Sequence, residues 1–300
     1  MLRTQEDNDL GQTVQPFQPR QHMLGAKYEV YHYRDSRLDD VAVHHHDFYE
    51  VYFFLSGNVD YSIEGRNYRL LPGDVLLIGP MELHQPHIIQ ERQPYERMVL
   101  WMRRGYLESL STPQASLSRC FDTSRPEHKN LLRLNPQKRQ EVSALMEKLL
   151  AESASDEYAS GLLADATLVT LLVEINRIAA GTVDRHETPD KSSAVIAEIL
   201  SYINDHYHED LSLDGLASRF FISKYHLSHE FNRLVGTSVY RYIIQKRLVI
   251  ARQMLAGGLA PTDVYQHCGF GDYANFYRAF KSEYHISPKE YLNCAAREQS

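Results

Sequence analysis

The chain has 300 residues, 43% of them hydrophobic, and a formal net charge of −7, which fits a globular protein with two domains. It has no run of 18 consecutive apolar residues, which excludes a membrane-spanning helix, and its three scattered cysteines exclude a disulfide framework. The polar first residues resemble neither a signal peptide nor a transit peptide. We therefore expect a cytoplasmic protein.

Residues 1–24 are predicted to form a flexible arm. From residue 25 to residue 134 the pattern changes to short runs rich in Tyr, Val, Ile and Phe, punctuated by turns such as Pro72-Gly73-Asp74. Many short strands at regular spacing are typical of a sandwich or small barrel. We predict strands within residues 27–34, 47–56, 58–64, 67–71, 74–80, 85–90 and 95–104.

One segment of this region carries side chains that bind metals in many proteins. The set consists of His44, His46, Glu50 and His84. The first two occupy alternate strand positions, so their imidazoles face one way, and the carboxylate faces the same cavity. The donor set suits a divalent metal ion. The spacing resembles the two motifs of cupins, in which the matching side chains converge inside a jelly roll.

Residues 135–181 are predicted to be helical, because their apolar residues recur at helical spacing. In the first helix these are Val142, Leu145 and Leu149, and in the second they are Leu162, Ala166, Val169, Leu172, Val173 and Ile175. Residues 182–194 are polar, lack such periodicity and are predicted to form a flexible linker. The rest of the chain, residues 195–300, is predicted to be a separate helical domain.

This last domain contains two helix-turn-helix patterns, the first between Leu211 and Gly236. Ser212 and Ser223 are predicted N-caps of its two helices, and Gly236 ends the second. Apolar residues at helical spacing form a buried stripe on that second helix. Polar side chains on its opposite face are of types that bond base edges or phosphates.

The second pattern runs from Ala260 to Leu292. Pro261 suits the first position of a helix, Gly269 stops that helix, and Asp272 can cap the next one. Between the two patterns, residues 238–256 form one predicted helix, about 28 Å long at about 1.5 Å per residue. A spacer of that length can hold two recognition helices about one DNA turn apart, roughly 34 Å.

The charge distribution agrees with DNA binding by this domain. Residues 212–290 carry ten Lys and Arg against six Asp and Glu, whereas residues 1–190 carry 20 basic and 28 acidic residues. The positive field therefore belongs to the helical domain, where phosphates would lie.

The domain resembles the DNA-binding domain of the AraC/XylS family of bacterial transcription regulators. The resemblance covers about a third of the chain and is carried by Leu213, Leu216, Ala217, Ser223, Leu227, Phe231, Gly236, Tyr242, Arg247, Ala251, Leu255, Gly269, Phe270, Phe276, Phe280, Lys281, Pro288 and Tyr291. It predicts an α+β protein with two domains. A cupin-like β-barrel or jelly roll with two helices precedes an all-α domain, in which two helix-turn-helix units are joined by a long helix.

From the outward faces and the resemblance together, we predict a set of DNA-binding residues. These are Lys224, Tyr225, Ser228, His229, Asn232, Arg233, Arg247, Tyr273, Ala274, Asn275, Tyr277, Arg278 and Lys281. The resemblance implies promoter DNA, RNA polymerase and a second copy of the chain as partners, with the helices of 135–181 forming the dimer contact.

The resemblance also implies that the barrel senses a small molecule, commonly a sugar, and that the protein is an activator. The predicted effector-binding residues are His44, His46, Glu50, Tyr52, His84, Trp101 and Arg103. A divalent metal held by the three histidines and Glu50 stays open as an alternative, and so does a purely structural role for the histidines.

The rival class is a metal-dependent cupin enzyme, such as an isomerase or dioxygenase, with the helices as an accessory domain. A DNA-binding module with a degenerate barrel is a third interpretation. The sequence has no nucleophile elbow, phosphate loop or CxxC pair, so other enzyme classes lack support, and we predict a regulator rather than an enzyme.

Overall fold

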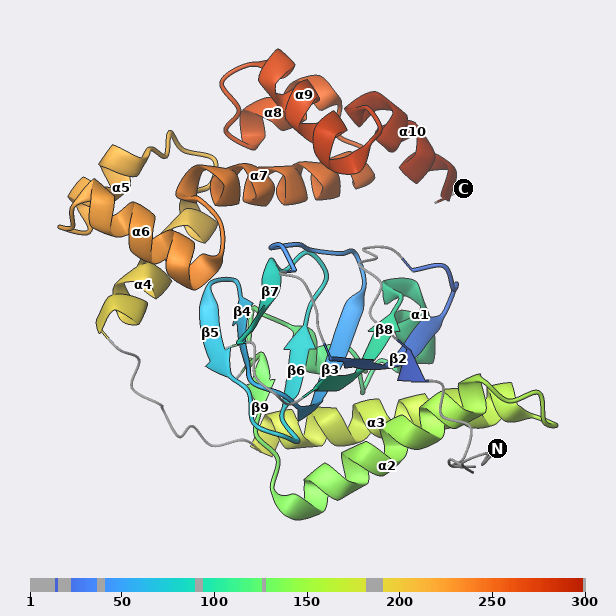
Figure 1. Cartoon of the computed structure of the whole chain (residues 1–300). Coiled ribbons are helices and arrows are strands. Elements are labelled where there is room, and N and C mark those ends of the chain that lie inside the picture. Colours follow the sequence, from blue (N-terminus) through green and yellow to red (C-terminus); the bar gives the residue numbers. More distant parts are fainter. Residues whose placement is uncertain are drawn as a thin grey trace, which may run out of the picture. The chain divides into compact units, whose positions relative to one another are not determined.

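The computed structural model describes residues 14–15, 23–36, 41–89, 94–125, 128–181 and 191–298. The chain divides into two compact units, one comprising Met1–Ile63 with Asn67–His186 and the other Glu64–Arg66 with Glu187–Ser300. The first unit is rich in strands and the second is built from helices (Figure 1). Of the predicted arm, only residues 14–15 and 23–24 are described, and of the predicted linker only residues 191–194, which begin a helix.

The β-rich unit contains two sheets. The larger has the strand order β1-β2-β8-β3-β6-β9 and the smaller the order β5-β4-β7. The strands are β1 (Val14–Gln15), β2 (Tyr28–Asp35), β3 (Tyr49–Ser56), β4 (Val59–Ile63), β5 (Arg66–Arg69), β6 (Val75–Ile78), β7 (His84–Ile88), β8 (Tyr95–Met102) and β9 (Leu131–Leu132). The seven predicted strands are confirmed, whereas β1 and β9, two residues each, were not predicted.

The large sheet is buried on both faces. Along β8, Val99 and Trp101 point to one face, towards a cluster of aromatic side chains. Met98 and Leu100, at the alternate positions, point to the other face and join a core formed with two helices. This double burial explains why the central strands read as nearly continuous apolar runs.

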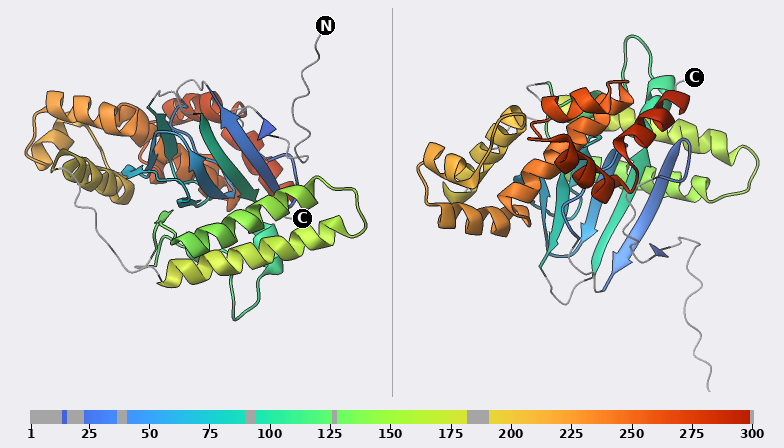
Figure 2. Two further views of the ribbon diagram at one scale, coloured as in Figure 1. Left: turned by 60° about the horizontal axis from the view of Figure 1, so that its bottom comes forward. Right: turned by 90° about the horizontal axis from the view of Figure 1, so that it is seen from above.

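Those helices are α2 (Pro136–Ser153) and α3 (Ser160–Gly181), which lie side by side along the sheet (Figure 2). Asn135 caps α2 by accepting a hydrogen bond from the Lys138 N–H at 2.9 Å. A short helix α1 (Arg104–Leu110) and a 3-10 turn η1 (Arg119–Phe121) complete this part of the unit, and neither was predicted.

Of the apolar positions identified on α3 from the sequence, Leu172 and Ile175 are fully buried, but others are not. The Leu162 residue is 73% exposed and Ala166 is exposed, whereas Leu168 and Leu171 are fully buried. The helix is apolar on most of its circumference, so periodicity alone could not identify the side that packs on the sheet.

The helical unit contains seven helices within the described residues. They are α4 (Lys191–His206), α5 (Leu213–Arg219), α6 (Lys224–Val235), α7 (Val239–Ala256), α8 (Pro261–His267), α9 (Tyr273–Tyr284) and α10 (Pro288–Glu298). The predicted caps are confirmed: Ser212, Ser223 and Asp272 each accept a hydrogen bond from the backbone N–H three residues on. Gly236 ends α6 at a φ of 73°, a left-handed conformation that favours glycine.

Helix α7 holds the two helix-turn-helix units together. Near its start, the buried Tyr242 ring packs edge-on against Phe231 of α6, with ring centroids 5.7 Å apart. In its second half, Leu248 and Leu255 join a buried cluster with Phe276 and Phe280 of α9. The predicted two-domain fold class is therefore confirmed. None of the described helices is long and apolar enough to span a membrane.

Candidate functional sites

The first candidate site is the outward face of α6, the second helix of the first helix-turn-helix unit. Leu227 and Phe231 are fully buried and fix the orientation of the helix. The predicted DNA-contacting side chains all lie on the exposed side, namely Lys224, Tyr225, Ser228, His229, Asn232 and Arg233. Tyr225 stacks on the His229 imidazole, with centroids 6.4 Å apart, so the helix presents an aromatic pair beside its cations.

The basic groups of α6 have acidic partners. The Lys224 Nζ lies 3.1 Å from Asp214 of α5. Glu230 contacts both His229 Nδ1, at 3.0 Å, and the Arg233 guanidinium, with Nη2 at 2.5 Å. These two contacts lower the pKa of Glu230 to about 2, Arg233 having the larger effect. The carboxylate is therefore ionised at neutral pH.

On the matching face of α9, the cations are Arg278 and Lys281, and neither forms an ion pair with a described carboxylate. Asp272 caps the helix and also accepts from the Asn275 side-chain amide at 2.5 Å. The Asn275 carbonyl oxygen in turn accepts from Arg278 Nη2 at 2.6 Å, so the guanidinium is held in place by an amide. Lys281 lies 6.0 Å from the Tyr277 ring centroid. Tyr273, Ala274 and Asn275 are exposed at the start of the helix.

Arg247 does not belong to either outward face. Its Nε donates to the Tyr207 carbonyl at 2.8 Å and its Nη2 to the Glu209 carbonyl at 2.7 Å. The guanidinium therefore connects α7 to the segment after α4. These contacts give the half-buried Arg247 a role in holding the domain together, and we leave it out of the proposed DNA contacts.

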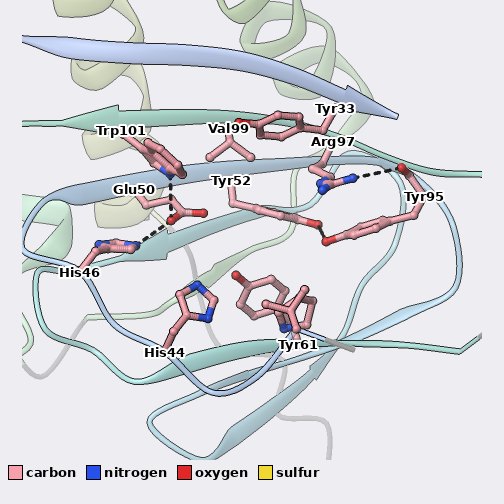
Figure 3. A pocket seen from close by; sticks show the side chains of 12 residues that line it. Tyr33, His44, His46, Glu50, Tyr52, Tyr61, Tyr95, Arg97, Val99 and Trp101 are labelled. Carbon is pink, nitrogen blue, oxygen red and sulfur yellow. Dashed lines mark hydrogen bonds and ion pairs between the residues drawn. The ribbon is translucent and has the colours of Figure 1, made fainter. Parts of the chain in front are cut away.

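The second candidate site is a pocket in the β-rich unit, shown in Figure 3. It is partly open to solvent. Its lining consists of Tyr33, Val41, His44, His46, Glu50, Tyr52, Tyr61, Pro86, Tyr95, Arg97, Val99 and Trp101. Four phenols, one indole and two imidazoles make it an aromatic chamber with polar groups directed inward.

Glu50 is the hydrogen-bonding centre at one end of the pocket. Its Oε2 accepts from Trp101 Nε1 at 3.2 Å and lies 2.8 Å from His46 Nε2. His84 Nε2 is 4.0 Å from the same oxygen. His84 lies beside the pocket rather than on its lining, with its ring 4.2 Å from that of His44, centroid to centroid. The four side chains grouped from the sequence are therefore neighbours.

The three histidines share one orientation. The Nδ1 atoms of His44, His46 and His84 lie 2.9, 2.9 and 2.8 Å from the backbone carbonyls of residues 42, 48 and 82. A carbonyl only accepts, so each Nδ1 must carry the proton and donate. In their neutral forms His44 and His84 then offer a lone pair at Nε2, whereas His46 Nε2 lies 2.8 Å from Glu50 Oε2 and must share a proton with that carboxylate. Burial lowers the pKa of His44, and of His84 further, which favours the neutral ring.

Arg97 occupies the other end of the pocket (Figure 3). It is buried, ion-paired with Asp35, and its guanidinium lies 4.1 Å from the Tyr95 ring centroid. The Tyr52 and Tyr95 hydroxyls are hydrogen-bonded to each other. Burial raises the pKa of Tyr52 and Tyr61 well above 10. These phenols therefore stay protonated and can donate hydrogen bonds to a ligand.

The predicted effector residues line the pocket with two exceptions, His84, which lies beside it, and Arg103. Arg103 lies past the end of β8, and its guanidinium donates to the carbonyls of Met23 and Gly25. Arg97 stands in the pocket instead. The sequence analysis missed Arg97, although it lies four residues before Trp101 and therefore on the same face of the strand. Tyr33, Tyr61 and Tyr95 were also missed, since no motif marks them.

A ligand pocket in a β domain, joined in one chain to paired helix-turn-helix units, defines a DNA-binding regulator with a sensor domain. Two family models match: "AraC-like ligand binding domain" over residues 27–172 and "Helix-turn-helix domain" over residues 216–293. The chain belongs to the AraC/XylS family of transcription regulators.

Relatives of the same organisation match most of the chain. The transcriptional activator RhaS of an Enterobacter species is 28% identical over 85% of this chain and 90% of its own length. RhaS of Escherichia coli O157:H7 is 24% identical over 84% and 87%, respectively. Among solved structures, apo ToxT of Vibrio cholerae is 14% identical at a TM-score of 0.38, covering 89% of this chain and 97% of its own. The curated relatives are regulators rather than enzymes.

The placement of the arginines gives a first test. The probe is a duplex that the wild-type protein selects from a random library. Arg278→Ala should weaken binding to this duplex by about 1–3 kcal/mol, because an oriented, exposed guanidinium is lost. Its melting temperature should stay unchanged. Arg247→Ala should lower the melting temperature instead, because two hydrogen bonds to backbone carbonyls are lost. Fluorescence anisotropy and thermal unfolding measure the two effects, and an unchanged affinity of the Arg278 variant removes that residue from the contacts.

Proposed function

We propose that the protein is a transcription activator controlled by an uncharged carbohydrate or related polyol, which binds in the aromatic pocket of the β-rich unit. The observation that carries this proposal is the pairing of the charged groups inside the pocket. Arg97 already has Asp35 as a counter-ion, and both are buried. Because Asp35 already neutralises this guanidinium from outside the pocket lining, a ligand carboxylate would gain little at that end, and an acidic effector is disfavoured.

The remaining groups suit a ligand with several hydroxyls. The Oε1 of Glu50 would accept hydrogen bonds from ligand hydroxyls, because Oε2 is already engaged by Trp101 and His46. A carboxylate accepts such bonds more strongly than a neutral group does. The phenols of Tyr52 and Tyr61 supply donors, and the faces of aromatic rings pack against the C–H surface of a sugar. A neutral polyol would thus satisfy both ends of the pocket without burying an additional charge.

Control of DNA binding requires the effector to bind two states of the protein with different affinity. The effector would shift the balance between an arrangement that occupies promoter half-sites and one that does not. As an activator, the bound protein would then contact RNA polymerase. The RhaS relatives are transcriptional activators, which supports this sign of regulation.

Trp101 makes the effector proposal directly measurable, because it is the only tryptophan of the chain and lines the pocket. A panel of neutral sugars, each with its matched sugar acid, should contain a neutral compound that changes tryptophan emission and raises the melting temperature. Glu50→Gln should lower the affinity for that compound by at least about tenfold, because a charge-assisted hydrogen bond is lost. Arg103→Gln, outside the pocket, is the matched control. A response to sugar acids alone contradicts the proposal.

A metal-responsive sensor is a second candidate, favoured by the orientation of the histidines. His46, Glu50 and His84 present ligand atoms that lie within 4.8 Å of one another and are buried. Within the described part of the chain, the Nε2 of His84 has no hydrogen-bond partner. Backbone carbonyls hold the opposite nitrogens, as they do for histidines that bind metals.

The distances in this cluster are compatible with such an ion. Tetrahedral zinc with bonds of about 2.0–2.1 Å places its ligand atoms about 3.3 Å apart. The observed separations from Glu50 Oε2 are 2.8 Å to His46 Nε2 and 4.0 Å to His84 Nε2. Two imidazoles, a carboxylate and His44 nearby would hold a first-row divalent ion, which would supply a positive charge for ligand oxygens.

Isothermal titration of chelator-treated protein with zinc or nickel tests this candidate. One equivalent of metal ion should bind, and His84→Ala should lower the affinity for that ion at least tenfold, because a ligand is removed. His87→Ala on the same strand is the control, since odd spacing puts it on the opposite face of the sheet. If wild type and His84→Ala bind zinc equally, the histidines have only a structural role. The sugar titration above is unaffected by that outcome.

We further propose that the protein is a homodimer that pairs through the outer face of α3. Leu162 is 73% exposed on this helix, and Tyr158 just before it is fully exposed. A second copy would cover these side chains.

Leu162→Asp should shift the mass measured by light scattering from dimer to monomer, because a buried carboxylate would have no partner there. Leu24→Asp, which alters a leucine with 75% exposure elsewhere on the unit, is the matched control. A wild-type protein that elutes as a monomer at micromolar concentration contradicts this pairing.

A further inference from the structure

The two outward helices differ in how their cations are compensated. On α6, Lys224 pairs with Asp214, and Arg233 and His229 both contact Glu230. On α9, neither Arg278 nor Lys281 forms an ion pair with any described residue. Within the described residues, the cations of these two helices that lack an ion-pair partner therefore lie on α9, although both helices carry basic residues.

Glu230 lies at the centre of the α6 network. Its side chain is only 12% exposed, whereas those of His229 and Arg233 are 62% and 51% exposed. The carboxylate thus lies beneath the two groups that face outward. Arg233 approaches it through both Nε, at 3.1 Å from Oε2, and Nη2, which fixes the plane of the guanidinium.

An ionised carboxylate in this position has two opposing effects on DNA binding. It repels phosphates and competes with them for Arg233, which weakens attachment to any duplex regardless of sequence. It also holds Arg233 and His229 in a fixed geometry before DNA arrives, so less side-chain entropy is lost when these groups bond base edges. The first effect lowers non-specific affinity more than specific affinity, because non-specific binding rests almost wholly on phosphate attraction.

We propose that Glu230 is a positioning residue that sets the sequence discrimination of the first unit, while α9 supplies the electrostatic attachment. The first helix-turn-helix unit then acts chiefly as the selective reader and the second chiefly as the anchor. Discrimination arises from an unfavourable interaction with the wrong partner as well as from contacts with the right one.

Glu230→Gln tests the proposal through the salt dependence of binding. Dissociation constants are measured by anisotropy for a duplex selected by the wild-type protein and for a random duplex, from 50 to 300 mM potassium chloride. The variant should bind the random duplex about three- to tenfold more tightly, with a salt slope steeper by about one. Its preference for the selected duplex should fall at least threefold.

Two controls separate this role from others. Glu198→Gln makes the same change of charge on an exposed position of α4 and should leave the preference unchanged. Lys281→Gln should reduce the salt slope by about one on both duplexes and leave the preference intact, as expected for an anchor.

Three outcomes overturn the proposal. An unaltered slope and preference in Glu230→Gln, with the same melting temperature, make the residue a passive surface group. Loss of binding to the selected duplex alone, at unchanged slope, makes it a direct base reader. An equal loss on both duplexes with a lowered melting temperature makes it a structural residue.

Discussion

Both DNA-reading units depend on the packing of side chains against one helix. The first half of α7 supports α6 through Tyr242 and Phe231, and the second half supports α9 through Leu248, Phe276 and Phe280. Because these contacts are fully buried, neither recognition helix can turn without opening a core. The 18 residues of α7, about 27 Å of helix, therefore fix the separation at which two grooves can be read.

Much of this architecture could be predicted from the sequence, because caps and apolar spacing are local signals. Ser223 and Asp272 precede helices that they do cap, and the long strands follow runs of aromatic and β-branched residues. Strands of two residues carry no periodic signal, so β1 and β9 escaped prediction. The inward side of α3 also escaped, since Leu162 and Leu168 are equally apolar in sequence and only packing distinguishes them.

The candidate sites also contain features that the sequence predicts and features that it does not. The histidines and Glu50 are brought together as their spacing suggested, but not by strand alternation. His44 forms an isolated bridge with His84, and His46 lies in the irregular segment before β3. The roles of the arginines could not be read in that way. Arg97 and Arg103 share a strand face by count, yet β8 ends at Met102, so only Arg97 reaches the pocket. Arg247 matches a family position, but its hydrogen bonds to two distant carbonyls exist only in the folded domain.

Charge compensation links the pocket and the reading helices in physical terms. In the pocket, Asp35 neutralises the buried Arg97, which weakens the attraction of this guanidinium for a free anion. On α6, Glu230 likewise neutralises Arg233. A free cation attracts every anion in its neighbourhood. A cation that is already paired binds well only to a partner whose geometry replaces the existing ion pair. Affinity is given up in both places, and what remains depends more steeply on the fit of the partner.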